Sequence, residues 1–312
     1  MVEQRVKLSS RDPSRRRPRP SKSQVATRRA IALVLLAGGL GLAVWLVTVA
    51  VGGIGASDSK KTTPTVPVAP PALKIIFPEG FTRAQMAERI SAVNEIAREK
   101  RNITPRLSAQ TYLKVTDNSL TPGKFARDNK RRALEGFLFP ATYEFEPKTT
   151  SRQLVTRQLD SFRANWAKVD LAYSASRRLT PYDVLIIASM IEKEVVAPEE
   201  RALVSAVIYN RLKAGMVLGI DATTRYGFNV PPTESLTNSQ LESFHPYNTR
   251  RVAGLPPTPI ANPGLASMQA AAHPAKTDYI FFVRKPDKVH HFFTARESEF
   301  FAKKCEYGFG CG

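Results

Sequence analysis

A sixteen-residue segment that begins at Thr180 is almost wholly apolar, and its pattern predicts a buried helix. Thr180 is suited to cap this helix and Pro181 to occupy its first position, while Asp183 completes a capping box. At about 100° per residue the apolar side chains cover most of the circumference, so that only Ser189 and Lys193 face away. Such a helix belongs inside a core.

Glu192 and Glu194 stand near the end of this helix. They fall about 160° apart around the axis, one on each flank of the apolar sector. Desolvation raises the pKa of a carboxyl group. A carboxyl group that stays protonated near neutral pH is suited to donate a proton during cleavage of a glycosidic bond. The alternative is two helix-end carboxylates without a catalytic role, and periodicity alone leaves both interpretations open.

Shorter patterns before and after this helix predict an α+β fold, because strand-like alternation and helical spacing occur in turn with Gly and Pro at the breaks. The predicted elements are a strand at 73–77, helices at 83–90, 108–115, 151–169 and 199–213, a polar loop or short helix at 221–227, a capped helix at 262–272, and a hairpin of strands 279–283 and 290–294.

Residues 135–145 are rich in aromatic side chains and are interrupted by Pro140. Flat rings stack on the apolar faces of pyranose sugars, so these side chains are suited to line a sugar groove. Packing in the core is the competing use, and it is the more common fate of aromatic residues.

Residues 30–56 contain no charged side chain, and the apolar run from Ile31 to Val51 is long enough to cross a hydrocarbon layer of roughly 30 Å. We therefore expect a single transmembrane helix. A cleavable signal peptide is the alternative, but its apolar region usually has roughly 7 to 15 residues.

The expected membrane helix separates two segments of different composition. Residues 1–29 hold ten basic and two acidic side chains, which predicts a disordered cytoplasmic tail by the positive-inside rule. Residues 57–72 are rich in Ser, Thr and Pro and favour an extended linker. The protein is then expected in the cell membrane, with residues 57–312 outside the cytoplasm.

The whole chain carries 46 Lys and Arg against 27 Asp and Glu, a formal net charge of +19. This excess is compatible with an anionic membrane surface, an acidic wall polymer or nucleic acid. The sequence contains no nucleic-acid-binding motif, so we do not expect nucleic acid as a partner.

Both cysteines, Cys305 and Cys311, lie in the last eight residues. In an oxidising compartment they could close a small disulfide loop, and two free thiols are the alternative. They have no His or further Cys nearby, so no zinc site is expected.

Nine short motifs, taken in order, resemble the YceG-like membrane-bound endolytic murein transglycosylases known as MltG, over roughly residues 73 to 300. The motifs are Glu79-Gly80, Gly136-Phe-Leu-Phe-Pro-Ala-Thr-Tyr143, Ala188-Ser-Met-Ile-Glu-Lys-Glu194, Asn210-Arg-Leu212, Asp221 with Tyr226-Gly227, Tyr247-Asn-Thr249, Gly254-Leu-Pro-Pro-Thr-Pro-Ile260, Ala271-Ala-His-Pro274 and the terminal hairpin. The order of so many segments is far more specific than any one of them.

The resemblance implies a domain organisation behind the membrane anchor. It predicts a small LysM-like α/β module at 73–135 and an α+β catalytic domain at 136–304, which leaves 305–312 as a cysteine-containing tail outside the family pattern. Members often have Ser-Asp-Pro where this chain has Ile220-Asp221-Ala222, a departure that keeps the carboxylate.

The resemblance also implies site residues. Glu192 matches the general acid of the family. The residues expected to contact or support the bound sugar are Glu194, Asp221, Tyr226, Tyr247, Asn248, Thr249 and His273. Glu194 is expected to support the acid from the side, and for His273 a purely structural role is the alternative.

The implied reaction is a lytic transglycosylation that needs no cofactor and no metal. One glutamate protonates the glycosidic oxygen and then accepts the proton of the muramic acid 6-hydroxyl as that oxygen closes on C1, which leaves a 1,6-anhydro end. Glu192 and Glu194 cannot act as a hydrolase pair, because side chains two apart on a helix diverge. A hydrolase that uses Asp221 as its second carboxylate and leaves reducing ends remains a rival.

A second rival is a non-catalytic scaffold that binds the wall through its LysM-like module. The expected partners are peptidoglycan glycan strands and the membrane, with peptidoglycan synthases as candidate protein partners.

Overall fold

The computed structural model describes residues 72–120, 125 and 131–310. The chain divides into two units, Met1–Val68 and Ala69–Gly312, and every described residue belongs to the second unit. Within these ranges no helix combines the length and apolar character needed to cross a membrane. The predicted membrane helix at 30–56, the tail before it and the linker up to residue 71 lie outside the described residues.

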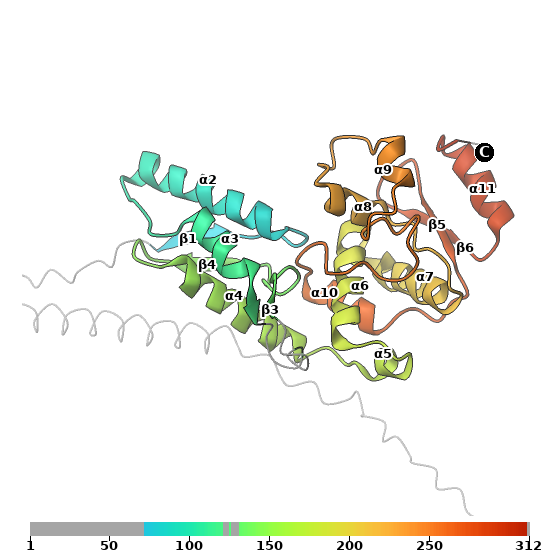
Figure 1. The fold of residues 1–312 in the computed structure, drawn as a ribbon, viewed down its shortest axis with the longest axis horizontal. Coiled ribbons are helices and arrows are strands. Elements are labelled where there is room, and N and C mark those ends of the chain that lie inside the picture. Colours follow the sequence, from blue (N-terminus) through green and yellow to red (C-terminus); the bar gives the residue numbers. More distant parts are fainter. Residues whose placement is uncertain (1–71, 121–124, 126–130, 311–312) are drawn as a thin grey trace, which may run out of the picture. The chain divides into compact units, whose positions relative to one another are not determined.

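The described part is an α+β structure of helices and three two-stranded antiparallel sheets, which pair β1 with β4, β2 with β3 and β5 with β6 (Figure 1). The elements in chain order are β1 Leu73–Ile76, α2 Arg83–Arg101, α3 Ala109–Asp117, β2 Ser119–Leu120, β3 Arg131–Arg132, β4 Thr142–Phe145, α4 Ser151–Trp166, α5 Ala172–Ser176, α6 Pro181–Glu194, the 3-10 turn η2 Pro198–Glu200, α7 Arg201–Lys213, α8 Asp221–Phe228, α9 Asn238–Glu242, α10 Leu265–Ala272, β5 Phe281–Arg284, β6 His291–Thr294 and α11 Glu297–Glu306.

The sheet of β1 and β4 explains why buried and exposed residues alternate along these two strands. Leu73 pairs with Phe145 and Ile75 with Tyr143, and all four side chains are buried while their neighbours along each strand point outward. Helix α2 packs on β1, and α3 packs between α2 and α4. The predicted boundary at 135/136 therefore passes between two paired strands, and the LysM-like character of the first module stays a prediction.

Helix α2 begins where it was predicted but is longer. Thr82 caps it and forms a capping box with Gln85, as the polar start signal suggests. The prediction ended at Ile90, where the apolar pattern fades, but the helix continues to Arg101 and stops at Asn102, which has a left-handed φ of 53°. Its second half is mostly exposed, so hydrophobic periodicity gives little sign of it.

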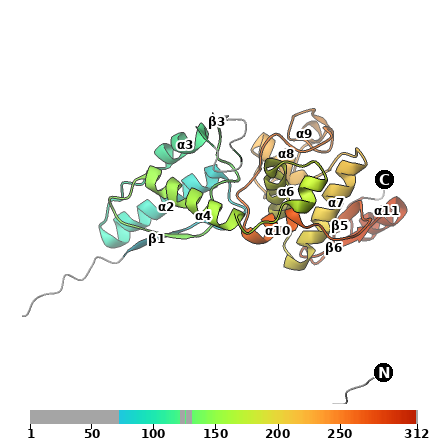
Figure 2. The same cartoon turned by 90° about the horizontal axis from the view of Figure 1, so that it is seen from below.

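Helix α6 confirms the prediction made from its apolar pattern. Thr180 caps the helix, Asp183 completes the capping box, and every side chain from Val184 to Ile191 is buried. In both views α6 lies among α7, α8 and α10 (Figure 1, Figure 2). Because neighbours surround it, the site at its C-terminal end is built on a rigid element.

The expectation that Ser189 faces away from the core is wrong. Ser189 is fully buried, its Oγ donates to the Ile186 carbonyl at 2.7 Å, and the Ile260 N–H donates to the same Oγ at 3.0 Å. A small hydroxyl satisfied by two backbone groups is tolerated in a core. It attaches the rigid segment that ends at Ile260 to the middle of α6.

The capped helix predicted at 262–272 begins later than expected. Helix α10 starts at Leu265 after Gly264, which provides no side-chain cap. Asn262 is instead fully buried, where its Oδ1 accepts from the Leu138 N–H at 2.9 Å and its Nδ2 donates to the Phe81 carbonyl at 2.9 Å. This asparagine joins three distant segments rather than ending a helix.

The terminal hairpin is confirmed as β5 and β6, with Phe281 opposite Thr294. The short helix at 221–227 is confirmed as α8, and α7 follows η2 within the predicted 199–213 span. Three short or exposed helices, α5, α9 and α11, had no predicted counterpart, and neither α9 nor α11 has a buried residue.

Glu135 is a buried carboxylate at the start of the aromatic segment 135–145. It accepts hydrogen bonds from the Arg83 N–H at the start of α2, from Asn262 Nδ2 at 2.8 Å and from the Tyr226 hydroxyl of α8 at 3.2 Å. Burial raises the pKa of Glu135 to about 7, although these donors oppose the shift. The group therefore titrates near neutral pH while it joins three segments.

The raised pKa of Glu135 predicts a loss of stability as the pH rises. The folded chain holds this proton up to about pH 7, whereas the unfolded chain releases it near 4.5, so the contribution is complete below about 4.5 and is lost as pH rises through 7. The loss is at most on the order of 3 kcal/mol. Urea unfolding of the full chain in detergent at pH 5 and pH 8 should show this fall, and Glu135→Gln should reduce it. An equal fall in both proteins would contradict the assignment.

Candidate functional site

The two glutamates at the end of α6 lie in different surroundings. Glu192 points toward the N-terminus of α10, where the Gly264 N–H donates to its Oε2 at 3.0 Å. The Glu79–Gly80 turn lies against the same side chain, because a Cβ added at Gly80 would stand 3.5 Å from Glu192 Cγ. Lys193 Nζ also donates to the Gly80 carbonyl at 3.3 Å.

Glu79 is a second carboxylate at this place, and it was not predicted as a site residue although the Glu79-Gly80 motif contains it. Its side chain fills the space where Gly264 has no Cβ, since an added Cβ would stand 1.8 Å from Glu79 Oε1. Burial raises the pKa of Glu79, the Glu192 charge raises it further, and Arg201 opposes the shift. A side chain at position 264 would therefore have to displace the Glu79 carboxylate.

Glu194 has neighbours of mixed charge on the other side of α6. Burial is the main cause that raises the pKa of Glu194. Arg284 of β5 opposes this shift, Asp221 adds to it, and the Ala222 N–H and Arg250 oppose it. The carboxyl group is therefore at the first turn of α8, beside one further carboxylate and two guanidinium groups.

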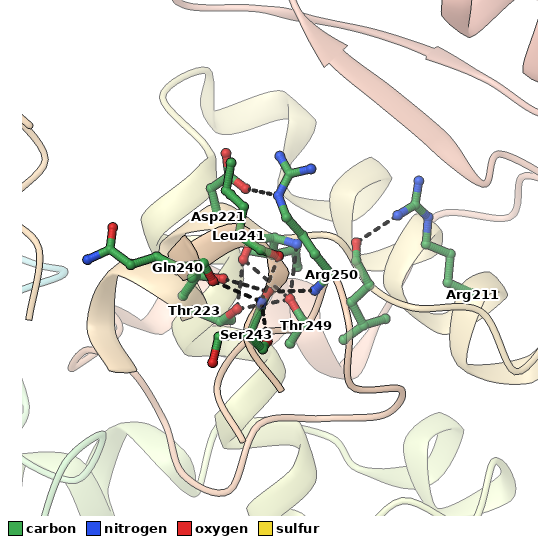
Figure 3. Close-up of polar contacts among 12 residues, drawn as sticks. Arg211, Asp221, Thr223, Gln240, Leu241, Ser243, Thr249 and Arg250 are labelled. Atoms are coloured by element: carbon green, nitrogen blue, oxygen red, sulfur yellow. Dashed lines mark hydrogen bonds and ion pairs between the residues drawn. The ribbon is translucent and has the colours of Figure 1, made fainter. Parts of the chain in front are cut away.

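Asp221 and Arg250 form an ion pair between Asp221 Oδ1 and Arg250 Nε (Figure 3). Each side chain is about 45% exposed, at 45% and 44%, so this edge of the cluster faces solvent. The pair raises the pKa of Arg250, chiefly through its hydrogen bond. Neither Arg250 nor Arg284 was predicted as a site residue, because both reach Glu194 from segments distant in sequence.

Asn248, predicted to hold sugar hydroxyls, is fully buried, and its amide is occupied by the protein itself. Its Oδ1 accepts from the Arg250 N–H at 3.1 Å and from the Thr224 hydroxyl at 3.1 Å. Its Nδ2 donates to the carbonyl oxygens of Gln240, Leu241 and Ser243 (Figure 3). The residue shapes the loop around it and presents no free group to a ligand.

Thr249 is likewise buried. Its Oγ1 accepts from the Ile220 N–H at 3.0 Å and lies 2.9 Å from the Thr223 hydroxyl, and its carbonyl accepts from the Gly219 N–H at 2.8 Å. These bonds fix the residues that lead into α8. Thr249 thereby helps to position Asp221, and its contact with a sugar stays a prediction.

The two predicted tyrosines lie together, with ring centroids 5.2 Å apart for Tyr226 and Tyr247. The Tyr226 hydroxyl donates to Glu135, and the Tyr247 hydroxyl lies 2.7 Å from that of Thr258. Both rings therefore connect α8 to the surrounding rigid segments, and both remain only partly buried.

His273 is exposed at the C-terminal end of α10, whereas Glu192 binds Gly264 at the other end. Nine residues of helix correspond to about 13 Å. The structure thus places His273 at the opposite end of α10 from Glu192 instead of beside it.

The remaining predictions concern metals and the disulfide. Over residues 72–120, 125 and 131–310, no group of three or more His, Cys, Asp or Glu side chains is arranged to hold a metal ion. Cys305 lies in α11, but Cys311 is outside the described residues, so their disulfide stays a prediction.

Comparison with known proteins adds to this geometry. The model of the YceG-like family matches residues 60–305. An endolytic murein transglycosylase of Bacillus subtilis (strain 168) is 32% identical over 218 residues, which cover 69% of this chain and 59% of that protein. One from Streptococcus pneumoniae (strain ATCC BAA-255 / R6) is 30% identical over 238 residues, 70% of this chain and 41% of that protein.

A solved structure is also similar. The 2.6 Å crystal structure of a putative yceG-like protein from Listeria monocytogenes has a TM-score of 0.56 and 30% identity, and the match covers 74% of this chain and 75% of that one. This chain spans 59% or less of the two transglycosylases described above. The family match extends over most of the chain, and the chain belongs to the YceG-like family.

Proposed function

We propose that this protein is a membrane-anchored endolytic murein transglycosylase that cleaves glycan strands and leaves 1,6-anhydro ends. The observation that carries the proposal is a partly buried glutamate with a raised pKa, Glu194, at the end of a rigid helix beside a half-exposed charged cluster. The names of the related proteins from B. subtilis and S. pneumoniae support the same activity.

The proposal assigns the general acid to Glu194, whereas the sequence resemblance pointed to Glu192. The Glu192 carboxylate is engaged by the Gly264 N–H and lies against Glu79, so it serves to hold the start of α10. Glu194 instead adjoins the half-exposed Asp221–Arg250 pair. A sugar can approach from that side, and the raised pKa of Glu194 favours the protonated form that a general acid needs.

The chemistry then follows from the groups around Glu194. Its proton passes to the glycosidic oxygen as the C1–O bond breaks, and the carboxylate that results is stabilised by Arg284 and Arg250. The same carboxylate next accepts the proton of the C6 hydroxyl while O6 bonds to C1. The Asp221 carboxylate lies where it can stabilise positive charge at C1, and no water is consumed.

The hydrolase rival needs Asp221 to activate a water molecule. Asp221 is already engaged by Arg250 in an ion pair, and this pairing favours a role in electrostatic stabilisation over activation of a water molecule. Mass spectrometry separates the possibilities, since a transglycosylase product lacks one water per new end. The absence of any released product would favour the scaffold.

The first prediction from the proposed function compares the two glutamates of α6. Glu194→Gln keeps the volume but has no proton to give, so release of anhydro ends from purified sacculi should fall by at least roughly 10² to 10⁴. Glu192→Gln is the matched control and should lose less. Circular dichroism checks folding. A folded Glu194→Gln protein with near wild-type activity, beside an inactive Glu192→Gln, would return the acid to Glu192.

A second prediction concerns pH. Asp221 raises the pKa of Glu194, so Asp221→Asn should lower that pKa and move the alkaline limb of the kcat/KM profile to lower pH. Asp160→Asn removes an exposed carboxylate paired with Arg163 on α4 and should leave the profile unchanged. A limb that stays in place in Asp221→Asn would exclude Glu194 as the titrating acid.

A third prediction concerns topology. We propose that residues 1–29 are cytoplasmic and residues 57–312 lie outside, anchored by 30–56, with peptidoglycan synthases as candidate partners. Alkaline phosphatase needs disulfides that form outside the cytoplasm, so its fusion after Gly312 should be active. An inactive fusion there, with an active one at the N-terminus, would reverse the orientation.

A further inference from the structure

Phe244 is the most exposed large hydrophobic side chain of the described residues, at 74%. It follows α9, on the loop that the Asn248 amide holds by the carbonyl oxygens of three residues. One exposed aromatic side chain is by itself ordinary. The residues around Phe244 indicate a function for this ring.

The backbone on both sides of Phe244 is fixed. The His245 N–H donates to the Ser243 hydroxyl at 3.2 Å, and the His245 ring packs on Phe228 of α8 with centroids 4.7 Å apart. The Tyr247 N–H donates to His245 Nδ1 at 3.3 Å. The ring of Phe244 is thus presented to solvent by an ordered loop, which lowers the entropic cost of binding through it.

Arg251 accompanies this ring. Its guanidinium carbon lies 5.2 Å from the centroid of Phe244, in the range of a cation–π contact, and Arg251 is itself exposed. The guanidinium group keeps donors for a carboxylate, which it binds in a bidentate manner. Phe244 and Arg251 together, here called the Phe244–Arg251 platform, combine an apolar surface with an anion-binding group.

The platform is next to the charged cluster along the chain. Arg251 directly follows Arg250, which is paired with Asp221 and acts on the pKa of Glu194. Thr249, next to Arg250 in the chain, is buried and fixed to the residues that lead into α8. Arg250 and Arg251 thus share one fixed segment, which brings the platform within reach of a long polymer bound at Glu194.

The occupant follows from this combination of chemistry. Pyranose rings present apolar C–H faces that stack on aromatic rings, and murein strands carry carboxylates on their lactyl groups or stem peptides. We propose that the Phe244–Arg251 platform is a binding subsite for the glycan strand, in which Phe244 stacks on one sugar ring and Arg251 binds a carboxylate attached to the strand. This inference rests on the proposed function and adds the residues that hold the strand beside the reacting bond.

The test measures binding and cleavage separately, with the full chain in detergent. Co-sedimentation with purified sacculi gives an apparent Kd, and anhydro-end release gives kcat and KM. Phe244→Ala should raise Kd and KM about tenfold with kcat little changed, and Phe244→Trp should restore both. Phe309→Ala removes a ring that is 53% exposed near the C-terminus and is the matched control.

Arg251 is tested through the charge of the sacculi. Arg251→Ala should weaken binding to native sacculi severalfold. It should not weaken binding to sacculi whose carboxylates have been converted to amides, because the anion that Arg251 binds is then gone. An equal loss on both preparations would overturn the role given to Arg251.

The remaining outcomes separate this inference from the proposed function. If Phe244→Ala binds and cleaves like the wild type, the subsite is wrong although the transglycosylase stands. If no anhydro ends form but Phe244→Ala still loses binding, the subsite stands and the activity fails. The wild-type chain already contains Trp45 and Trp166. In proteoliposomes with brominated phosphatidylglycerol and phosphatidylcholine, tryptophan quenching in Phe244→Trp beyond that of the wild type, with sacculus binding of Phe244→Ala unchanged, would assign the ring to a membrane surface instead.

Discussion

The buried carboxylate of Glu135 is the group on which the arrangement around α6 depends. It binds the N-terminus of α2, the Tyr226 hydroxyl of α8 and the Asn262 side chain. Asn262 in turn exchanges backbone hydrogen bonds with Gly80 and Phe81, so the Glu79–Gly80 turn is set against the start of α10. A buried carboxylate costs free energy unless its acceptors are satisfied, and here its donors come from three distant segments. These hydrogen bonds offset the cost, and they fix the positions of the three segments relative to one another.

The two glutamates of α6 have different roles, one structural and one chemical. Glu192 faces inward to Gly264 and Glu79, where carboxylates and a helix N-terminus hold the first module's turn against α10. Glu194 faces Asp221 and Arg250, where part of the surface is open. Divergence of residues two apart on a helix makes this division possible. The helix is rigid because its apolar residues are buried on all sides, so both carboxylates are placed precisely enough for their tasks.

Local signals in the sequence predicted the elements, and long-range contacts decided the site. The cap at Thr180, the apolar run of α6 and the β5–β6 hairpin depend on neighbouring residues and were predicted correctly. The burial of Asn248 and Asn262 was not predicted. The sequence alone does not distinguish an asparagine that binds a sugar from one that binds a backbone carbonyl. The neighbours of Glu194 come from α8, from β5 and from the segment that contains Arg250. The spacing of residues in the sequence does not predict that these segments meet.

The central claim is that desolvation and the neighbouring Asp221 charge raise the pKa of Glu194 above the ordinary value of a glutamate. The most direct measurement is a carbon-13 NMR titration of the glutamate side-chain carboxyl groups in the full chain, with the Glu194 signal identified by its loss in Glu194→Gln. The account predicts that this carboxyl titrates above the value of about 4.3 found in model peptides. A midpoint at or below that value would contradict it.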